Sequence, residues 1–231
     1  MTAIFVTGTG TDVGKTFVAC GLVTEFRRRG HPVAAFKPLA SGFDPARPET
    51  SDPGALLTAL GNRISPAALD CIAPWRYAAA LAPDMAAKAE GKCVDFDAVV
   101  AFSRAALGAA EMVVIEGVGG AMSPIAARHT VLDWIAGLQL PALLVTGTYL
   151  GAQTHALTAL AALQARGVKV LAMVASETPG STVSLAETTR SLTRFAAPVP
   201  VVSIPRLAPS APHAAFTALA DLFCCDAAHV R

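Results

Sequence analysis

One loop constrains the fold of this chain more than any other feature: Gly8-Thr-Gly-Thr-Asp-Val-Gly14-Lys15-Thr16. It follows a short apolar run and opens a helix-length segment, which is the setting that a phosphate-binding loop needs. Its glycines let the backbone curl so that successive N–H groups point at phosphate oxygens, and the helix N-terminus adds partial positive charge. Lys15 is expected to bridge the β- and γ-phosphates of a nucleotide, and the Thr16 hydroxyl to bind Mg²⁺. Gly8 and Gly14 are separated by five residues, one more than in the standard pattern.

Short apolar runs alternate with helix-length segments along the rest of the chain. Six runs are continuously apolar, as expected of strands buried on both faces: Ala3–Thr7, Val33–Lys37, Met112–Glu116, Ala142–Thr146, Val168–Ala175 and Val199–Ile204. Four segments between them have helical length and mixed polarity: Lys15–Arg29, Phe96–Ala109, Ala152–Arg166 and Ser181–Phe195. Gly30 and Gly167 follow Arg-bearing helix ends and are typical stop signals. This rhythm predicts one α/β domain over residues 1–231, a doubly wound, mostly parallel sheet of the P-loop NTPase type with helices on both faces.

Composition narrows the classes of function. The formal net charge is +1 and no basic run appears, so nothing indicates binding to nucleic acid or to an anionic membrane. The five cysteines are odd in number and include no paired C-x-x-C motifs, which favours a reducing cytoplasm over a disulfide framework or a zinc site. The N-terminus opens directly into a strand pattern without a cationic signal-peptide region. Residues 134–164 contain no Asp, Glu, Lys or Arg, but Pro, Gly and polar residues interrupt them, so we expect a buried strand and then a helix.

Two further segments carry side chains suited to nucleotide chemistry. The strand Met112–Glu116 ends in a carboxylate followed by glycines, which predicts a metal-side group beside the phosphate loop. Lys37 ends the second strand, so its ammonium group is expected to point toward the same crevice. Residues 39–53 are rich in Pro, Ser, Gly and Asp, and are expected to form an irregular loop, either functional or an ordinary surface loop. Within it, Asp52 is expected to cap a following helix or to bind Mg²⁺, and the sequence alone favours the cap.

These segments together resemble the dethiobiotin synthetase family. The resemblance runs in order along nearly the whole chain, through Val6–Thr16, Lys37-Pro-Leu-Ala-Ser-Gly42, Ser51-Asp52, Glu116-Gly-Val-Gly-Gly120, Asp133-Trp134, Leu150-Gly151 with His155, and Ile204-Pro205. The Lys-Pro-x-Ala-Ser-Gly element is the most specific of these. The longer spacing in the phosphate loop also belongs to the pattern of this family.

The resemblance implies an ATP- and Mg²⁺-dependent cyclo-ligase that acts on 7,8-diaminononanoate. CO₂ adds to one amine, ATP phosphorylates the carbamate, and the neighbouring amine closes a cyclic urea, which gives dethiobiotin, ADP and phosphate. A carbamate that attacks the γ-phosphate brings one anion to another, so cations have to neutralise both. Lys15, Lys37 and Mg²⁺ are suited to this task. Because the nucleophiles belong to the substrate, no Ser-His-Asp or Cys-His arrangement is needed.

The resemblance also implies roles for single residues. It makes Lys37 and Lys15 catalytic, and it assigns Mg²⁺ to Thr16, Asp52 and Glu116. It assigns substrate contacts to Thr11, Ser41, Gly151 and Thr154. It assigns ATP contacts to Asp12, Val13, Gly14, Lys15, Thr16, Phe17, Asp52, Glu116, Gly117, Val118, Gly119, Ser176, Glu177, Pro205, Arg206 and Leu207.

The family is homodimeric and its loop at Gly151 reaches the substrate of the partner subunit, so a cytoplasmic homodimer is expected. Thr154 stands where the family often has Asn, Asp84 where it commonly has His, and Arg206 where it usually has an aromatic residue. Ser176-Glu177 replaces an Asn-Asp-type pair at the adenine site. Because one short hydroxyl cannot span the amine and the ring nitrogen of adenine, we expect weak discrimination among nucleoside triphosphates.

Two other functions also fit a phosphate loop. An amidoligase of the cobalamin-synthesis type would need a glutaminase partner, and we see no further domain here to supply one. A guanine-selective switch would show Asn-Lys-x-Asp where this chain has Ala175-Ser-Glu-Thr178. A partitioning ATPase would carry an extra lysine early in its phosphate loop, and residues 8–13 contain none. Turnover of the diamine with bicarbonate distinguishes the three.

Overall fold

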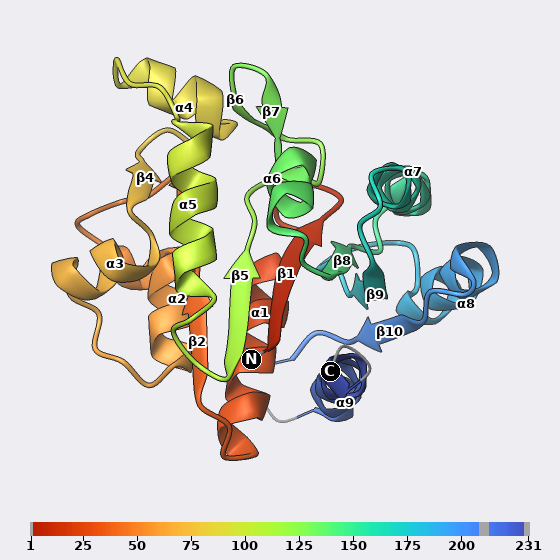
Figure 1. The fold of residues 1–231 in the computed structure, drawn as a ribbon. Coiled ribbons are helices and arrows are strands. Elements are labelled where there is room, and N and C mark those ends of the chain that lie inside the picture. The colour runs from red at the N-terminus through yellow and green to blue at the C-terminus, as the bar shows by residue number, and fades with distance from the viewer. Residues whose placement is uncertain (1, 208–212, 229–231) are drawn as a thin grey trace.

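The computed structural model describes residues 2–207 and 213–228, with side chains through Cys224. Its centre is a sheet of six strands in the order β10-β9-β8-β1-β5-β2, all paired in parallel (Figure 1). These strands are β1 (Thr2–Gly8), β2 (Val33–Phe36), β5 (Met112–Glu116), β8 (Ala142–Thr146), β9 (Val170–Ser176) and β10 (Val201–Ile204). All six predicted strands and the doubly wound, parallel architecture are therefore confirmed. That residues 1–231 act as one domain stays a prediction.

The helices are α1 (Lys15–Arg28), α2 (Asp52–Ala59), α3 (Pro66–Ile72), α4 (Pro83–Ala89), α5 (Phe96–Ala106), α6 (Val131–Leu138), α7 (Ala152–Ala165), α8 (Leu185–Ala196) and α9 (Ala214–Ala228). Two short pairs of strands lie outside the main sheet. β3 (Leu39–Ser41) runs parallel to β4 (Trp75–Tyr77), and β6 (Pro124–Ala126) runs antiparallel to β7 (His129–Thr130). A short 3₁₀ turn covers Pro48–Thr50.

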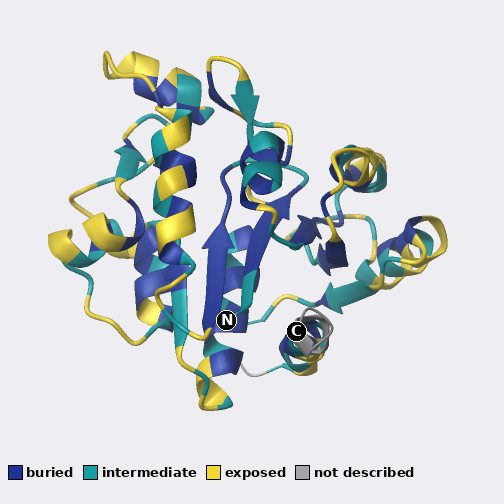
Figure 2. Cartoon of the chain, viewed as in Figure 1, coloured by how far each residue is buried: buried dark blue, intermediate teal, exposed yellow. Residues whose placement is uncertain are grey.

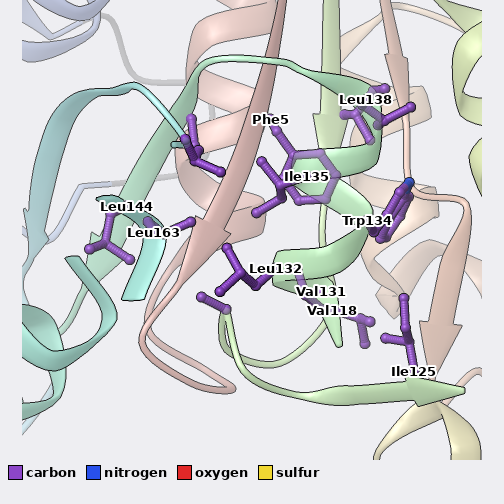
Figure 3. Packing of buried hydrophobic residues seen from close by; sticks show 14 of the residues in the cluster. Phe5, Val118, Ile125, Val131, Leu132, Trp134, Ile135, Leu138, Leu144 and Leu163 are labelled. Carbon is purple, nitrogen blue, oxygen red and sulfur yellow. The ribbon is translucent and has the colours of Figure 1, made fainter. Parts of the chain in front are cut away.

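Alternate residues of β1 face two separate cores, one on each side of the sheet. Phe5 lies in the core formed with α5, α6, α7 and α8, where its ring meets Trp134 edge-on at 4.9 Å between centroids (Figure 3). Ile4 and Val6 lie in the core formed with α1, α2, α3 and α9. Figure 2 shows the same layering, with buried central strands and helices exposed on their outer sides. The apolar runs of the sequence thus form strands covered on both faces.

The structure corrects several predictions about individual segments. The helix expected to start at Ser181 starts at Leu185, because the Ser184 hydroxyl accepts from Glu187 N at 3.1 Å and caps it. Residues 39–53 are not wholly irregular, since they include β3 and the 3₁₀ turn. Asp52 does not cap α2, because the Ser51 hydroxyl accepts from Gly54 N and Asp52 is the first helical residue.

The uncharged residues 134–164 include the expected strand and helix, β8 and α7, and they begin within α6, which was not predicted. Within residues 2–207 and 213–228, no helix combines the length and the apolar character that crossing a membrane requires.

Candidate active site

The phosphate loop joins the end of β1 to the start of α1, and close packing explains two of its glycines. Gly14 is the N-cap of α1 with a φ of 98°, and a Cβ there would lie 2.6 Å from Ser176 Oγ. A Cβ on Gly8 would lie 2.9 Å from a methyl group of Val13. Because Gly14 has no side chain to cap the helix, the first N–H groups of α1 stay available to a phosphate.

Lys15 is held over this loop rather than extended into solvent. Its side chain is buried, and its Nζ donates to Gly10 O at 2.7 Å. Burial, together with the nearby charge of Lys37, lowers the pKa of Lys15 to about 8. Among the described residues, the Lys15 ammonium therefore has one neutral acceptor, and it keeps the capacity to bind an anion.

A buried cluster of charges lies beside the loop. Lys37 directly follows β2 and Glu116 ends β5, and these strands pair in parallel, which brings the two residues together. Lys37 Nζ lies 2.6 Å from Glu116 Oε1 and 2.9 Å from Asp52 Oδ2, and it donates to Gly117 O at 2.7 Å. The side chains of Lys37 and Glu116 are 2% and 0% exposed, whereas that of Asp52, at the start of α2, is 48% exposed. The second strand, which was predicted to end at Lys37, ends one residue earlier, at Phe36.

The pKa shifts follow from this burial. Burial opposes the charged form of Lys37, but the charges of Glu116 and Asp52 outweigh it and raise the pKa of Lys37. Burial raises the pKa of Glu116, although Lys37 opposes the shift. The pKa of Asp52 is lowered, because the charge of Lys37 outweighs the effect of burial. Lys37 is therefore the charged centre of the cluster.

The cluster offers a partial set of oxygen ligands for a divalent cation. Thr16 Oγ1 donates to Glu116 Oε1 at 2.7 Å, and Glu116 Oε2 is buried without a hydrogen-bond partner among the described residues. Asp52 contributes a second, half-exposed carboxylate. In the part of the chain that the structure describes, no group of three or more His, Cys, Asp or Glu side chains gathers as a metal site. A hydroxyl and two carboxylates fit Mg²⁺, which typically keeps waters and takes phosphate oxygens as further ligands.

A cavity of about 480 Å³ opens over the phosphate loop and this cluster. Ten of its lining residues are predicted site residues: Thr11, Asp12, Gly14, Lys15, Thr16, Lys37, Ser41, Asp52, Val118 and Gly119. Ser41 is distinctive among them, because its Oγ is buried and has no partner among the described residues. A hydroxyl left unpaired at a cavity wall is available to a ligand.

A second, smaller hollow of about 30 Å³ shares Gly14 with the large cavity. Its lining contains the residues predicted for the nucleotide base, Ser176, Glu177, Pro205, Arg206 and Leu207, together with Gly14 and Phe17, which were predicted to contact the phosphates. Glu177 Oε2 accepts from Arg206 N at 2.8 Å, which ties the end of β9 to the segment after β10. The predicted phosphate and base residues thus form two adjoining parts of one surface.

Reciprocal hydrogen bonds fasten the loop after β8 to the loop after β9. Thr148 N donates to Thr178 Oγ1 at 3.0 Å, and Thr178 N donates to Thr148 Oγ1 at 3.1 Å. Gly151, with a φ of 92°, is the N-cap of α7, and Thr154 lies in the first turn of that helix. Neither Gly151 nor Thr154 lines the two cavities, so within this chain they lie apart from Thr11 and Ser41.

Other predicted residues lie below or behind the cavities. Val13 and Glu116 are buried under the loop, and Gly117 contributes its carbonyl to Lys37. Asp84 lies in the first turn of α4, where its Oδ1 is buried without a partner among the described residues.

Sequence reasoning did not identify five residues of the cavity wall: Ala80, Leu81, Ala82, Pro83 and Ser123. Four of them have small or apolar side chains without a polar or ionisable group, so their residue types do not indicate a role in binding. Ser123 lies three positions after Gly120, the last glycine of the segment predicted to border the nucleotide, and this closeness in sequence could have indicated that it belongs to the site.

Comparisons with known proteins identify a matching family and similar curated proteins. A family described as an AAA domain matches residues 2–214. The ATP-dependent dethiobiotin synthetase BioD of Phenylobacterium zucineum is 45% identical over 209 residues, which cover 89% of this chain and 89% of that protein. The ATP-dependent dethiobiotin synthetase BioD of Acidiphilium cryptum is 43% identical over 205 residues, which cover 87% of this chain and 92% of that protein.

Solved structures of other activities share the fold. The signal recognition particle receptor FtsY of Elizabethkingia anophelis in complex with GDP superposes with a TM-score of 0.54 at 17% identity, over 96% of this chain and 63% of that one. The MinC:MinD cell division protein complex of Aquifex aeolicus gives a TM-score of 0.52 at 12% identity, over 90% of this chain and 82% of that one. At these identities the likeness concerns the fold alone.

Proposed function

Because this chain belongs to the family of ATP-dependent dethiobiotin synthetases, we propose that it converts 7,8-diaminononanoate, CO₂ and ATP into dethiobiotin, ADP and phosphate. One structural observation supports this activity independently of the family. A phosphate loop, the buried Lys37–Glu116 pair and the unpaired hydroxyl of Ser41 border a single cavity or lie directly beneath it. The weak likeness to FtsY and MinD concerns the fold and does not favour a nucleotide switch.

The reaction has three covalent steps. One substrate amine attacks CO₂ and loses a proton, which forms a carbamate. A carbamate oxygen then attacks the γ-phosphorus of ATP, the bond to the bridging oxygen breaks, and ADP leaves. The second amine attacks the carbonyl carbon of the resulting mixed anhydride, phosphate leaves, and the amine proton goes to phosphate or solvent as the ring closes.

Lys37 and Lys15 are the catalytic residues in this proposal. Both are buried cations on the wall of the cavity, and each is placed by a fixed acceptor, Gly117 O for Lys37 and Gly10 O for Lys15. Such preorganised charges stabilise the anionic transition state of phosphoryl transfer without having to reorganise. Thr11 and Ser41 contact the carboxylated diamine from the same cavity.

The nucleotide lies across the two cavities. The N–H groups of residues 12–17 bind its phosphates, and the glycine turn at 117–119 lies beside them. The base enters the smaller hollow between Phe17, Ser176 and Glu177 on one side and residues 205–207 on the other. Thr16, Asp52 and Glu116 hold Mg²⁺, which when bound neutralises charge on the β- and γ-phosphates.

The proposal includes a homodimer in the cytoplasm. Gly151 and Thr154 lie outside the cavities of their own chain, and Leu150 beside them is 88% exposed. A second copy that docks this loop would carry the loop to the substrate of its partner, in a closed two-fold assembly. Light scattering of the active enzyme should give twice the chain mass, and a fully active monomer would refute this part.

The test of the function is incorporation of labelled carbon. The purified chain is supplied with the diamine, ¹³C-bicarbonate and MgATP, and the product is analysed by mass spectrometry. We expect a cyclic urea that carries one ¹³C, with one ADP formed for each product molecule. Formation of ADP without labelled product, at saturating diamine, would mean that the enzyme performs another ATP-dependent reaction.

A further inference from the structure

Ser123 holds a position on the cavity wall that the predicted roles leave unused. It lies between the glycine turn after β5 and the start of β6, and it lines the large cavity together with Lys37 and Ser41. Its backbone is fixed at both ends, because Ser123 N donates to Gly120 O at 2.9 Å and Ser123 O accepts from Val131 N at 3.0 Å. The side chain therefore projects from a rigid piece of the wall.

The Ser123 hydroxyl is fixed as an acceptor and unused as a donor. Its Oγ accepts from Gly120 N at 2.7 Å, and a Cβ on Gly119 would lie 2.2 Å from that oxygen, so the glycine turn closes tightly around it. A serine hydroxyl also has one proton to donate. Among the described residues, no acceptor takes this proton.

The same cavity holds a second hydroxyl that has no acceptor in the described part of the chain, the buried hydroxyl of Ser41. The two cations of the wall, Lys15 and Lys37, are assigned to the anionic phosphate and carbamate groups, and both also bond protein acceptors, Lys15 with Gly10 O and Lys37 with Glu116, Asp52 and Gly117 O. The hydroxyls of Ser41 and Ser123 are thus two neutral donors of the cavity wall that, like the Thr11 hydroxyl, can serve an uncharged or weakly charged oxygen of a ligand.

We infer that Ser123 is a further substrate-contacting residue, whose hydroxyl donates to an oxygen of the carboxylated diamine. The inference rests on the proposed function. When the second amine attacks the carbonyl carbon, negative charge grows on the carbonyl oxygen, and a fixed neutral donor stabilises that charge. The acceptor bond from Gly120 N holds the hydroxyl in place for this contact and strengthens its donor character through cooperativity.

The experiment compares S123A with S123T, which keeps the hydroxyl. Labelled cyclic urea and ADP are measured separately, the affinity for a non-hydrolysable ATP analogue is measured by calorimetry, and melting temperature reports on the fold. For S123A we expect about a 10- to 100-fold loss in kcat/KM for the diamine and more than one ADP per urea, with analogue affinity within about twofold of wild type. S123T should recover most of the activity and the one-to-one coupling.

Two outcomes overturn the inference. One is wild-type turnover and coupling in S123A. The other is equal loss of diamine turnover and analogue binding with coupling still one-to-one, since that pattern belongs to a residue that only shapes the glycine turn. If S123A does not fold, S123C replaces it, because the thiol keeps the shape of the side chain and is a weak donor. A wild-type enzyme that forms no cyclic urea would instead remove the proposed function itself.

Discussion

Helix α1 carries a cluster of charges at each end, and the two clusters are built differently. At its N-terminal end, Lys15 and Thr16 line the cavity with Lys37, and the buried Glu116 bonds both Thr16 and Lys37. At its C-terminal end, the nearly buried carboxylate of Glu25 is bound by Arg28 and Arg29. Both clusters place ionised groups in contact with a hydrophobic core.

In the C-terminal cluster, both carboxylate oxygens of Glu25 accept hydrogen bonds. Glu25 Oε1 accepts from Arg28, from Arg29 and from Thr217 Oγ1 at 3.2 Å, and Oε2 accepts from Arg28 Nε at 2.8 Å. Arg29 also reaches Asp221 on α9 at 2.7 Å. Hydrogen bonds from Arg28 hold the pKa of Glu25 at about 2, against the opposing effect of burial.

The N-terminal cluster leaves atoms unpaired. Glu116 Oε2 and Ser41 Oγ are buried without partners among the described residues, and burial raises the pKa of Glu116 rather than lowering it. An unsatisfied buried polar group costs folding free energy. The difference indicates that the C-terminal cluster stabilises the fold, whereas the N-terminal cluster keeps bonding capacity for a ligand.

The largest expected effect belongs to Lys15. Replacing it with alanine removes a counter-ion from the phosphates, and we expect cyclic-urea formation to fall about 10²–10³-fold. The circular dichroism spectrum should remain native, because among the described residues the Lys15 ammonium bonds a single loop carbonyl, Gly10 O. Turnover close to wild type would show that the phosphate loop does not need this charge.

The next largest effect is expected at Lys37, whose replacement should affect turnover of the diamine more than binding of the nucleotide. K37Q removes the cation at the centre of the cluster, and we expect kcat/KM for the diamine to fall about 100-fold. Affinity for MgATP, measured by calorimetry, should change much less, because the loop amides and Lys15 still bind the phosphates. Equal losses in the two quantities would reassign Lys37 to nucleotide binding or to the fold.

Replacement of Glu25 should lower the stability of the fold rather than the activity. E25Q is expected to lower the free energy of unfolding by about 2–3 kcal/mol at pH 7, since its folded-state pKa of about 2 lies well below the ordinary value of 4.5. A lowered carboxyl pKa stabilises the fold above pH 4.5 and loses this effect as the pH falls toward 2. The difference between variant and wild type in guanidinium unfolding should therefore shrink to about half by pH 3. A difference independent of pH would contradict the ionic role of Glu25.

The smallest expected effect lies at the base end of the nucleotide site. With Ser176 present, we expect ATP to be preferred over CTP and GTP by far less than about a thousandfold in kcat/KM. S176N should raise the preference for ATP by about tenfold, on the scale of one bidentate base contact. S176A is the matched control and should leave the ratios unchanged. A wild-type preference of about a thousandfold or more would mean that groups such as Glu177 and residues 205–207 already select adenine.

Features that depend on a local sequence pattern, such as the strands and the phosphate loop, could be predicted. Features that depend on backbone geometry or on contacts between distant residues could not. Continuous apolar runs located all six strands, and the phosphate loop located the edge of the sheet that carries the cavity. Ser51 was missed as a cap because both Ser51 and Asp52 are suitable residue types, and only the backbone geometry decides between them. The contact between Arg29 and Asp221 spans 192 positions, so no local pattern could reveal it. Ser123 became visible only when folding brought it to the cavity wall.

The most direct test measures S41A and E25Q side by side, by the rate of labelled cyclic-urea formation and by the free energy of unfolding in guanidinium chloride. S41A removes a buried unpaired hydroxyl, so we predict at least about a tenfold slower reaction and a stability equal to or above that of wild type. E25Q should keep the wild-type rate and lose stability. If S41A loses stability at an unchanged rate while E25Q loses activity, the assignment of one cluster to function and the other to the fold is wrong.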